Sequence, residues 1–411
     1  MVFLHKISVL IYLLVFPFIL LSQKSQTTDS LIRLLADSEQ DTVRLGLFIE
    51  LSNKIEKKDS LKKFAYADSA LTISKSLQKQ KYLAFSLKNK AWLFQTYKNY
   101  NDAIAFYKKT LFLFEKIGNK PEMATANYEL GRMYYRVNKP QKSLDLHKKA
   151  LETRNLLNDT SKIIESETAV AIMFWRLGEL NDAEKHFLRS LQLSEKTNDI
   201  KSTSTALNSL GAIYWGLGRF NRALEYYETA LAIAKKTNNN INYALVVNNI
   251  GLVYQEWGKN DIALENYRDG LKVAIKGGHF YASAYSYINI GKIYQLNKEY
   301  KTALVNFDSS LVNYKRASKK IGIAFTYRRK GNVYFEMGNI EKAIEYYKLS
   351  VKIADEINSK NHLAKALSAL AKAYFKINDY SSSNIAAKKS LSISLDNSYR
   401  NIAKDNYFTL S

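Results

Sequence analysis

The chain of 411 residues repeats itself every forty residues. Small residues mark this period at eight successive positions: Ala91, Gly131, Ala171, Gly211, Gly251, Gly291, Gly331 and Ala371. Three residues after each of them stands an aromatic residue: Phe94, Tyr134, Phe174, Tyr214, Tyr254, Tyr294, Tyr334 and Tyr374. No insertion or deletion interrupts the count. A fixed period of this length indicates one supersecondary unit that is stacked many times.

Residues 201–240 show what one unit contains. Apolar residues recur at three- and four-residue spacing from Ser202 to Leu217, which predicts an amphipathic helix. Gly218 is expected to end this helix, because glycine readily adopts the left-handed conformation found just past a helix terminus. Asn221 is then predicted to cap a second helix, which ends at the polar run 238–240. Each unit is therefore predicted to hold two helices.

This unit of two predicted helices with a glycine between them resembles the tetratricopeptide repeat. The signature positions in one unit are Gly211, Tyr214, Gly218, Ala223, Tyr227, Ala230 and Leu231. The resemblance covers residues 41–400 as nine units, and it implies an all-α fold, a right-handed α-solenoid of stacked helix-turn-helix repeats. The units have forty residues instead of the common 34 and mostly lack a proline between them, so the chain is similar to the extended-helix branch. That branch includes kinesin-light-chain-like repeats and bacterial peptide-receptor repeats.

The segment before the repeats predicts export. His5 and Lys6 precede the apolar run 7–21, which is typical of a secretory signal peptide over residues 1–22 with cleavage near Ser22. An uncleaved membrane anchor is the alternative, although the run is short for a membrane span. The chain has no cysteine, which excludes disulfides and lipid attachment through a cysteine. We therefore expect an exported protein of the periplasm or cell envelope.

Both flanks of the array carry further predictions. Residues 23–40 are expected to form a polar linker, over Gln23–Ser30, and a short N-terminal helix. The stretch from Asp29 to Arg44 resembles, more loosely, the opening of exported sensor regions in bacterial two-component histidine kinases and related regulators. At the other end Ser411 falls at the glycine position of a tenth unit. Residues 401–411 are therefore predicted to begin a tenth repeat of a truncated chain, or alternatively to form a capping helix.

The charge of the chain leaves its partner open. It carries 61 Lys and Arg residues against 38 Asp and Glu residues, a net charge of +23. Such a balance suits an acidic partner, an anionic surface or nucleic acid. The lysines are dispersed along the predicted helices, which favours solvated helix faces over a dedicated basic patch. Nucleic acid is disfavoured further, because export is predicted and no nucleic-acid-binding motif occurs.

The sequence contains none of the residue patterns that catalysis requires. Its five histidines share no metal-ligand spacing, and His147 and His186 are expected to be packing or surface residues in second helices. There is no cysteine for thiol chemistry, no glycine-rich phosphate loop and no Gly-x-Ser-x-Gly motif. We therefore predict a protein that is not an enzyme and that uses no cofactor or metal.

The resemblance implies that the first helix of each unit lines a concave groove, with the positions three before and one, four and five after the glycine facing it. Aromatic and amide candidates at these positions are Tyr135, Trp175, Asn208, Trp215, Asn248, Gln255, Gln295, Phe335 and Phe375. Basic candidates are Arg132, Arg136, Arg176, Lys292, Arg328, Lys372 and Lys376. Aromatic rings beside a basic, polar lining suit an extended peptide. The alternative is that these aromatic side chains pack against the next first helix.

Two functions are compatible with these features. The first is an exported, non-enzymatic scaffold that binds a protein or peptide ligand, and the charge is compatible with an acidic one. The second is the sensory portion of an envelope signalling protein, a histidine kinase or transcriptional regulator, whose membrane and transmitter parts are absent from this chain. Contact with a membrane is expected only through an uncleaved N-terminal segment or a missing C-terminal part.

Overall fold

The structure is a computed structural model that describes residues 27–396 and 399–410. Within these residues it contains helices α2 to α21 and no strand, and 85% of the chain is helical. The predicted all-α solenoid of stacked helix pairs is confirmed. None of the described helices is both long enough and apolar enough to cross a membrane. The predicted signal peptide, residues 1–22, lies outside the described residues.

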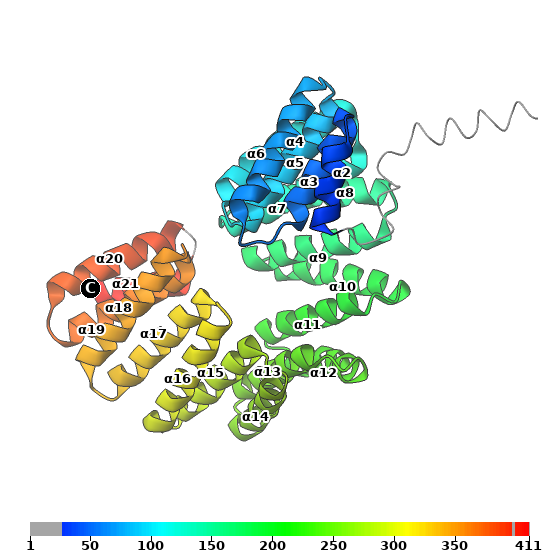
Figure 1. Ribbon diagram of the computed structural model, residues 1–411. Coiled ribbons are helices and arrows are strands. Elements are labelled where there is room, and N and C mark those ends of the chain that lie inside the picture. Colours follow the sequence, from blue (N-terminus) through cyan, green and yellow to red (C-terminus); the bar gives the residue numbers. More distant parts are fainter. Residues whose placement is uncertain (1–26, 397–398, 411) are drawn as a thin grey trace, which may run out of the picture. The chain divides into compact units, whose positions relative to one another are not determined.

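The chain divides into two compact units, Met1–Ala206 and Leu207–Ser411, and each is described by itself (Figure 1). The N-terminal unit contains α2 (Thr28–Asp37), α3 (Asp41–Lys54), α4 (Ser60–Ser76), α5 (Gln80–Thr96), α6 (Tyr100–Ile117), α7 (Lys120–Arg136), α8 (Pro140–Leu156), α9 (Thr160–Leu177) and α10 (Leu180–Lys196). Helix α11 (Ile200–Gly216) begins in this unit and ends in the next. The C-terminal unit continues with α12 (Phe220–Lys236), α13 (Asn240–Glu256), α14 (Asn260–Lys276), α15 (Phe280–Leu296), α16 (Tyr300–Arg316), α17 (Lys320–Glu336), α18 (Ile340–Glu356), α19 (Lys360–Lys376), α20 (Tyr380–Asp396) and α21 (Arg400–Leu410).

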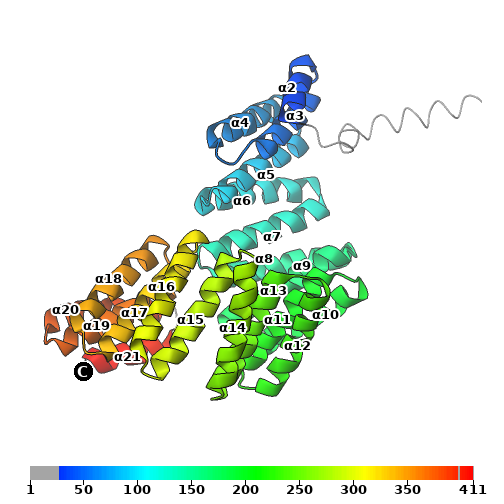
Figure 2. The same ribbon diagram turned by 60° about the horizontal axis from the view of Figure 1, so that its bottom comes forward.

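Consecutive helices pack as pairs, in which an odd-numbered first helix precedes an even-numbered second helix. In the C-terminal unit the pairs α15–α16 and α17–α18 lie side by side in both views (Figure 1, Figure 2). First helices also contact each other directly, as α13 contacts α15 and α17 contacts α19. The first helices of each unit therefore form a layer of their own, and one face of that layer is not covered by second helices.

The same turn connects each helix from α4 to α19 to the next one. One residue with a positive φ stands every twenty residues: Gln78, Lys98, Gly118, Asn138, Asn158, Gly178, Asn198, Gly218, Asn238, Gly258, Gly278, Lys298, Ser318, Gly338, Asn358 and Asn378. The prediction for Gly218, which has a φ of 70°, is confirmed. The prediction that Asn221 caps the following helix is wrong, because α12 begins at Phe220 with Arg219 as its capping residue. Only one residue separates the left-handed position from the next helix.

The periodic glycine lets a ring of the second helix lie against the backbone of the first. A Cβ added at Gly251 would stand 2.6 Å from the ring of Tyr267, which is fully buried. The same close approach joins Gly211 to Tyr227, Gly291 to Phe307 and Gly331 to Tyr347. At Gly131 the ring is that of His147, 2.9 Å from the added Cβ. In these five pairs the core therefore contains an aromatic ring set against a glycine.

The N-terminal flank differs from its prediction. Helix α2 begins at Thr28, inside the stretch that was expected to be a linker. Thr27 explains this start, because its Oγ1 accepts a hydrogen bond from the backbone N–H of Ser30 at 3.2 Å. Leu31 is fully buried in a cluster with residues of α3, so the short helix is also held by packing.

At the C-terminal flank, α21 packs against α19 and α20. Asn406 is fully buried there, and its Nδ2 donates to the Oγ of Ser390 at 2.8 Å. The last helix therefore occupies the position that the first helix of a further pair would take.

Candidate functional site

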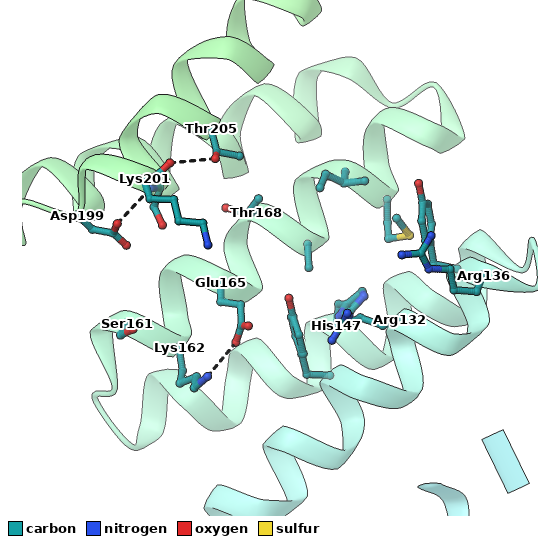
Figure 3. A pocket seen from close by; sticks show the side chains of 16 residues that line it. Arg132, Arg136, His147, Ser161, Lys162, Glu165, Thr168, Asp199, Lys201 and Thr205 are labelled. Atoms are coloured by element: carbon teal, nitrogen blue, oxygen red, sulfur yellow. Dashed lines mark hydrogen bonds and ion pairs between the residues drawn. The ribbon is translucent and has the colours of Figure 1, made fainter. Parts of the chain in front are cut away.

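The open face of the first helices contains a cavity of about 490 Å³ in the N-terminal unit (Figure 3). Helix α7 contributes Arg132, Tyr135 and Arg136 to its lining. Glu165 of α9 and Lys201 of α11 line it from neighbouring helices. Three predicted groove residues, all from α7, are thus brought together in one hollow.

The charges in this N-terminal cavity are of both signs. Arg132 donates from Nη1 to both carboxylate oxygens of Glu129, each at 2.9 Å. The carboxylate of Glu165 lies 3.3 Å from the amine of Lys162 and 3.2 Å from the guanidinium of Arg154. Lining charges that are paired in this way are oriented before any ligand arrives, which reduces the entropy that binding costs.

Tyr135 lies between two arginines at the edge of the cavity. The guanidinium of Arg176 is 4.8 Å from its ring centre and that of Arg136 is 6.0 Å away. Arg176 also donates to the Oδ1 of Asn138 at 3.3 Å. Trp175 is 43% exposed on the same helix as Arg176, and neither residue lines the cavity itself. Tyr135 is therefore one of two tyrosines, with Tyr128, that the cavity offers to a ligand.

His147 forms part of the floor of the cavity. It is 2% exposed and contacts the ring of Tyr128 edge-on, with 5.0 Å between the ring centres. Burial, together with the charges of Arg154 and Arg132, lowers the pKa of His147 to about 4. The imidazole is therefore neutral at neutral pH, and it occupies the position of the buried aromatic ring in this pair. No group of three or more His, Asp and Glu residues in the described part of the chain is placed to hold a metal ion.

The C-terminal unit has a second cavity, of about 520 Å³, between α17, α19 and α21. Three predicted residues line it: Arg328, Phe335 and Lys372. Lys372 is paired there with Asp405 of α21, at 3.3 Å between Nζ and Oδ2. Phe375 is 53% exposed but lies outside the lining, with its ring edge-on to Tyr380.

A row of polar side chains crosses the first helices α11, α13 and α15 within the C-terminal unit. Asn249 donates from Nδ2 to the Oδ1 of Asn208 at 2.9 Å. The hydroxyl of Tyr285 donates to the Oδ1 of Asn249 at 3.4 Å. Asn208 and Asn249 are both partly exposed, so their remaining donors and acceptors can reach a ligand.

Asn248 does not belong to this row, although its position predicted a groove residue. It is fully buried, and its Nδ2 donates to the Oγ of Ser286 at 2.7 Å and to the carbonyl of Ala244 at 2.8 Å. Gly270 of α14 leaves the space that the amide fills, since a Cβ there would stand 2.7 Å from Nδ2. The side chain therefore points into the helix pair, and its neighbour Asn249 reaches the open face instead.

Two further candidates, Gln255 and Gln295, are held by hydrogen bonds inside the repeat array. Gln255 accepts from the hydroxyl of Tyr267 at 2.8 Å, and Gln295, which is 8% exposed, donates to Glu336 at 2.6 Å. Trp215 is half-buried, and its Nε1 has no hydrogen-bond partner within the described residues. Lys292 is half-buried as well. The middle of the predicted groove is thus lined partly by side chains that already have intramolecular partners.

Residues that the sequence analysis missed stand two and six positions before the periodic glycine. Glu165 and Lys365 occupy the sixth position, and Asn249 and Arg329 occupy the second. The second position before the glycine lies three residues before the predicted groove position that follows the glycine, and the sixth lies four residues earlier still. Residues at these spacings share one face of a helix. That signal was present in the sequence.

The family model described as tetratricopeptide repeat matches residues 98–155, 162–236, 202–276, 280–356 and 322–396, which together exceed half of the chain. No curated protein matches the sequence.

Solved structures share the fold at low sequence identity. The apo form of the quorum sensor NprR from B. thuringiensis has 17% identity and a TM-score of 0.59, with 79% of this chain and 91% of that chain covered. Aspartyl phosphate phosphatase F from Bacillus subtilis has 17% identity and a TM-score of 0.57 at the same coverage. The Rap conjugation gene regulator of plasmid pLS20, solved in complex with the Phr* peptide, has 18% identity and a TM-score of 0.51, with 80% and 94% covered.

Proposed function

Because this chain belongs to the tetratricopeptide-repeat family, whose fold generally serves as a non-catalytic scaffold for protein interactions, we propose that it binds an extended peptide on the open face of its first helices. The observation that carries the proposal is the grouping of an aromatic ring with arginines in the N-terminal cavity, at Tyr135, Arg132 and Arg136. The peptide complex of the pLS20 regulator, which shares the fold, supports it.

Each compact unit offers its own groups to a peptide, Tyr135 and Arg136 in the N-terminal unit and Asn208, Asn249 and Phe335 in the C-terminal unit. The amides of Asn208 and Asn249 can pair with backbone N–H and C=O groups, which every peptide offers. The rings of Tyr135 and Phe335 provide apolar area with little rotamer entropy to lose. Arg136 is exposed and, being planar and always charged, can hold a carboxylate through two parallel hydrogen bonds. The ligand class that fits is therefore a peptide with apolar and acidic side chains.

A phage-displayed library of random dodecapeptides, selected on residues 27–411, tests the proposal. A selected peptide is then labelled with fluorescein, and its affinity is measured by anisotropy. We expect Tyr135→Ala to weaken binding by about 2 kcal/mol, as for other aromatic hot spots. Phe112→Ala is the matched control, because Phe112 is a 64% exposed aromatic residue on the second helix α6.

The arginines have a matched control as well. Arg136→Ala should weaken an acidic peptide, whereas Arg189→Ala, on the second helix α10, should leave its affinity unchanged. Circular dichroism of every variant shows whether the helices remain intact. Recovery of no peptide above background, or equal affinities for face variants and controls, contradicts peptide binding on this face.

We propose further that the protein is exported and has no enzymatic activity. The apolar run 7–21 after His5 and Lys6 supports export. N-terminal sequencing of the protein recovered from cell fractions tests it: an N-terminus near Gln23 in an envelope fraction is expected. A full-length protein that stays in the cytoplasm contradicts export.

The sensory portion of an envelope signalling protein is the second candidate function. The stretch from Asp29 to Arg44 favours it, because it resembles the opening of exported sensor regions. Sequencing of the transcript downstream of the codon for Ser411 tests this candidate. A transmembrane segment followed by a kinase or DNA-binding module is expected if it is correct, and a stop codon contradicts it.

A further inference from the structure

Four cationic side chains gather on the open face of the C-terminal unit without an ion pair. They come from three neighbouring first helices: Lys292 from α15, Arg328 and Arg329 from α17, and Lys365 from α19. None of the four forms a hydrogen bond or an ion pair with another described residue. The Nε atoms of Arg328 and Arg329 are buried and have no partner there.

The two arginines lie close together around a single ring. The guanidinium groups of Arg328 and Arg329 stand 5.3 Å and 5.1 Å from the centre of the Phe325 ring. Both distances are in the range of a cation–π contact. Two neighbouring guanidinium groups whose donors make no hydrogen bond to another described residue are therefore present on α17.

The acidic side chains in the neighbourhood are few and engaged. Asp405 is paired with Lys372 at 3.3 Å, and Glu336 accepts from Gln295 at 2.6 Å. Glu256 of α13 acts on Lys292 only at longer range and forms no ion pair with it. The charge of Glu336 opposes the lowering of the pKa of Arg329, but Glu336 forms no ion pair with it, so the four cations outnumber the two acidic side chains, Glu256 and Glu336, that act on them.

The mutual repulsion of these cations is visible in their pKa values. Burial, followed by the charge of Arg329, lowers the pKa of Lys292 to about 8. Burial, again followed by Arg329, lowers the pKa of Arg328 to about 10. Half-buried like charges that remain unpaired destabilise a fold, so a cluster of this kind calls for a bound counter-charge.

We propose that this cluster, consisting of Lys292, Arg328, Arg329 and Lys365, is a binding site for a phosphate monoester group. Arg328 and Lys365 line the cavity of about 520 Å³ and can contact the group directly. Arg329 and Lys292 are not part of that lining and add positive potential. A doubly charged oxoanion matches the charge of the cluster better than one carboxylate does, and the arginine fork fits phosphate oxygens in pairs. The phosphate site does not rest on the peptide ligand proposed above, although Phe335 lines the same cavity.

Titration calorimetry of residues 27–411 with defined anions tests this site. The probes are inorganic phosphate, O-phosphoserine, a peptide Gly-Gly-phosphoserine-Gly-Gly and its unphosphorylated form, with acetate and succinate as carboxylate controls. Inorganic phosphate that binds as tightly as both phosphoserine probes identifies free phosphate as sufficient. A stronger response to the phosphopeptide identifies a phosphorylated protein segment as the source.

The variants separate a binding role from a structural one. Arg328→Gln should weaken phosphate binding by at least about tenfold, which corresponds to one lost charged hydrogen bond, and Arg329→Gln should weaken it less, because only positive potential is removed. The matched control is Arg222→Gln, which removes an exposed arginine on the second helix α12. Arg328→Lys keeps the charge but loses the fork, so an intermediate affinity is expected.

Stability without ligand provides the second measurement. Because Arg329 repels its neighbours, Arg329→Gln should raise the midpoint of urea unfolding of the C-terminal unit while it weakens phosphate binding. A structural arginine would show the opposite change in stability. The proposal is overturned if no phosphate-bearing probe binds saturably, if succinate binds as well as phosphate, or if Arg222→Gln weakens binding as much as Arg328→Gln.

Discussion

The buried histidine in the N-terminal cavity should make the N-terminal unit sensitive to acid. His147 has its ordinary pKa of 6.5 in the unfolded chain and a pKa of about 4 in the fold, where burial and two arginines oppose its charge. Between these values the unfolded state binds a proton that the folded state does not. Stability is therefore complete above about pH 6.5 and falls as the pH drops toward 4. A difference of about 2.5 pKa units corresponds to a loss of about 3 kcal/mol.

The substitution His147→Phe isolates this effect. Phenylalanine already fills the same position in other pairs, at Phe187 and Phe307, where the ring is fully buried. Urea unfolding of wild type and variant is followed by circular dichroism near pH 7 and near pH 4. Other acid-sensitive groups are shared by both proteins and cancel in the difference, since distant sites act additively. We expect acidification from about pH 7 to about pH 4 to lower the free energy of unfolding by about 3 kcal/mol more in the wild type than in the variant.

The reciprocal substitution Phe187→His provides the matched control. It places an imidazole in the equivalent buried position of α10 and should introduce acid sensitivity there. Amide hydrogen exchange, corrected for intrinsic rates, assigns the loss to α7 and α8 in wild type. Equal loss of stability on acidification in wild type and His147→Phe would refute the reasoning, because the titrating group would then lie elsewhere.

Three further outcomes are expected from urea unfolding and binding measurements. Gly251→Ala should destabilise the C-terminal unit by about 1–3 kcal/mol, since its Cβ would stand 2.6 Å from the Tyr267 ring, whereas Gly216→Ala, whose Cβ meets nothing within 4 Å, should be neutral or stabilising. The lowered pKa of Lys292, about 8 against 10.5 when unfolded, means that stability should rise with pH across this interval, and Lys292→Met should abolish the rise. Asn248→Ala should cost about 1–3 kcal/mol of stability, because it removes two buried hydrogen bonds, while any peptide affinity stays unchanged.

The fold was predictable because its determinants are local and repeated. The left-handed position at Gly218 and the aromatic ring opposite each periodic glycine follow from residue types alone. The capping position was misassigned by two residues, since an asparagine at 221 is a good cap by type but lies inside the first turn of α12. Helix termini depend on where the preceding turn places the chain, which composition does not reveal.

The candidate site was predictable only in part. The position three before the glycine lines a cavity at Arg328 but is buried at Asn248. The difference is made by Gly270 on the opposing helix, a tertiary neighbour that no single-helix pattern contains. The pairing of Lys372 with Asp405 likewise depends on α21, which lies beyond the nine predicted repeats. Which cations are paired and which are free is thus decided by contacts between helices.

The positive-φ turns recur every twenty residues from residue 78 to residue 378 without interruption, although the pattern of side chains repeats only every forty residues. Recombination between two repeats can therefore remove or add forty codons without changing any junction, because each breakpoint rejoins the same turn. Loss of twenty codons would also preserve the turns. It would, however, exchange first and second helices, so that the aromatic ring of a second helix would face another aromatic ring instead of a glycine. Viable length variants in a lineage carrying this gene should accordingly differ by whole multiples of forty codons.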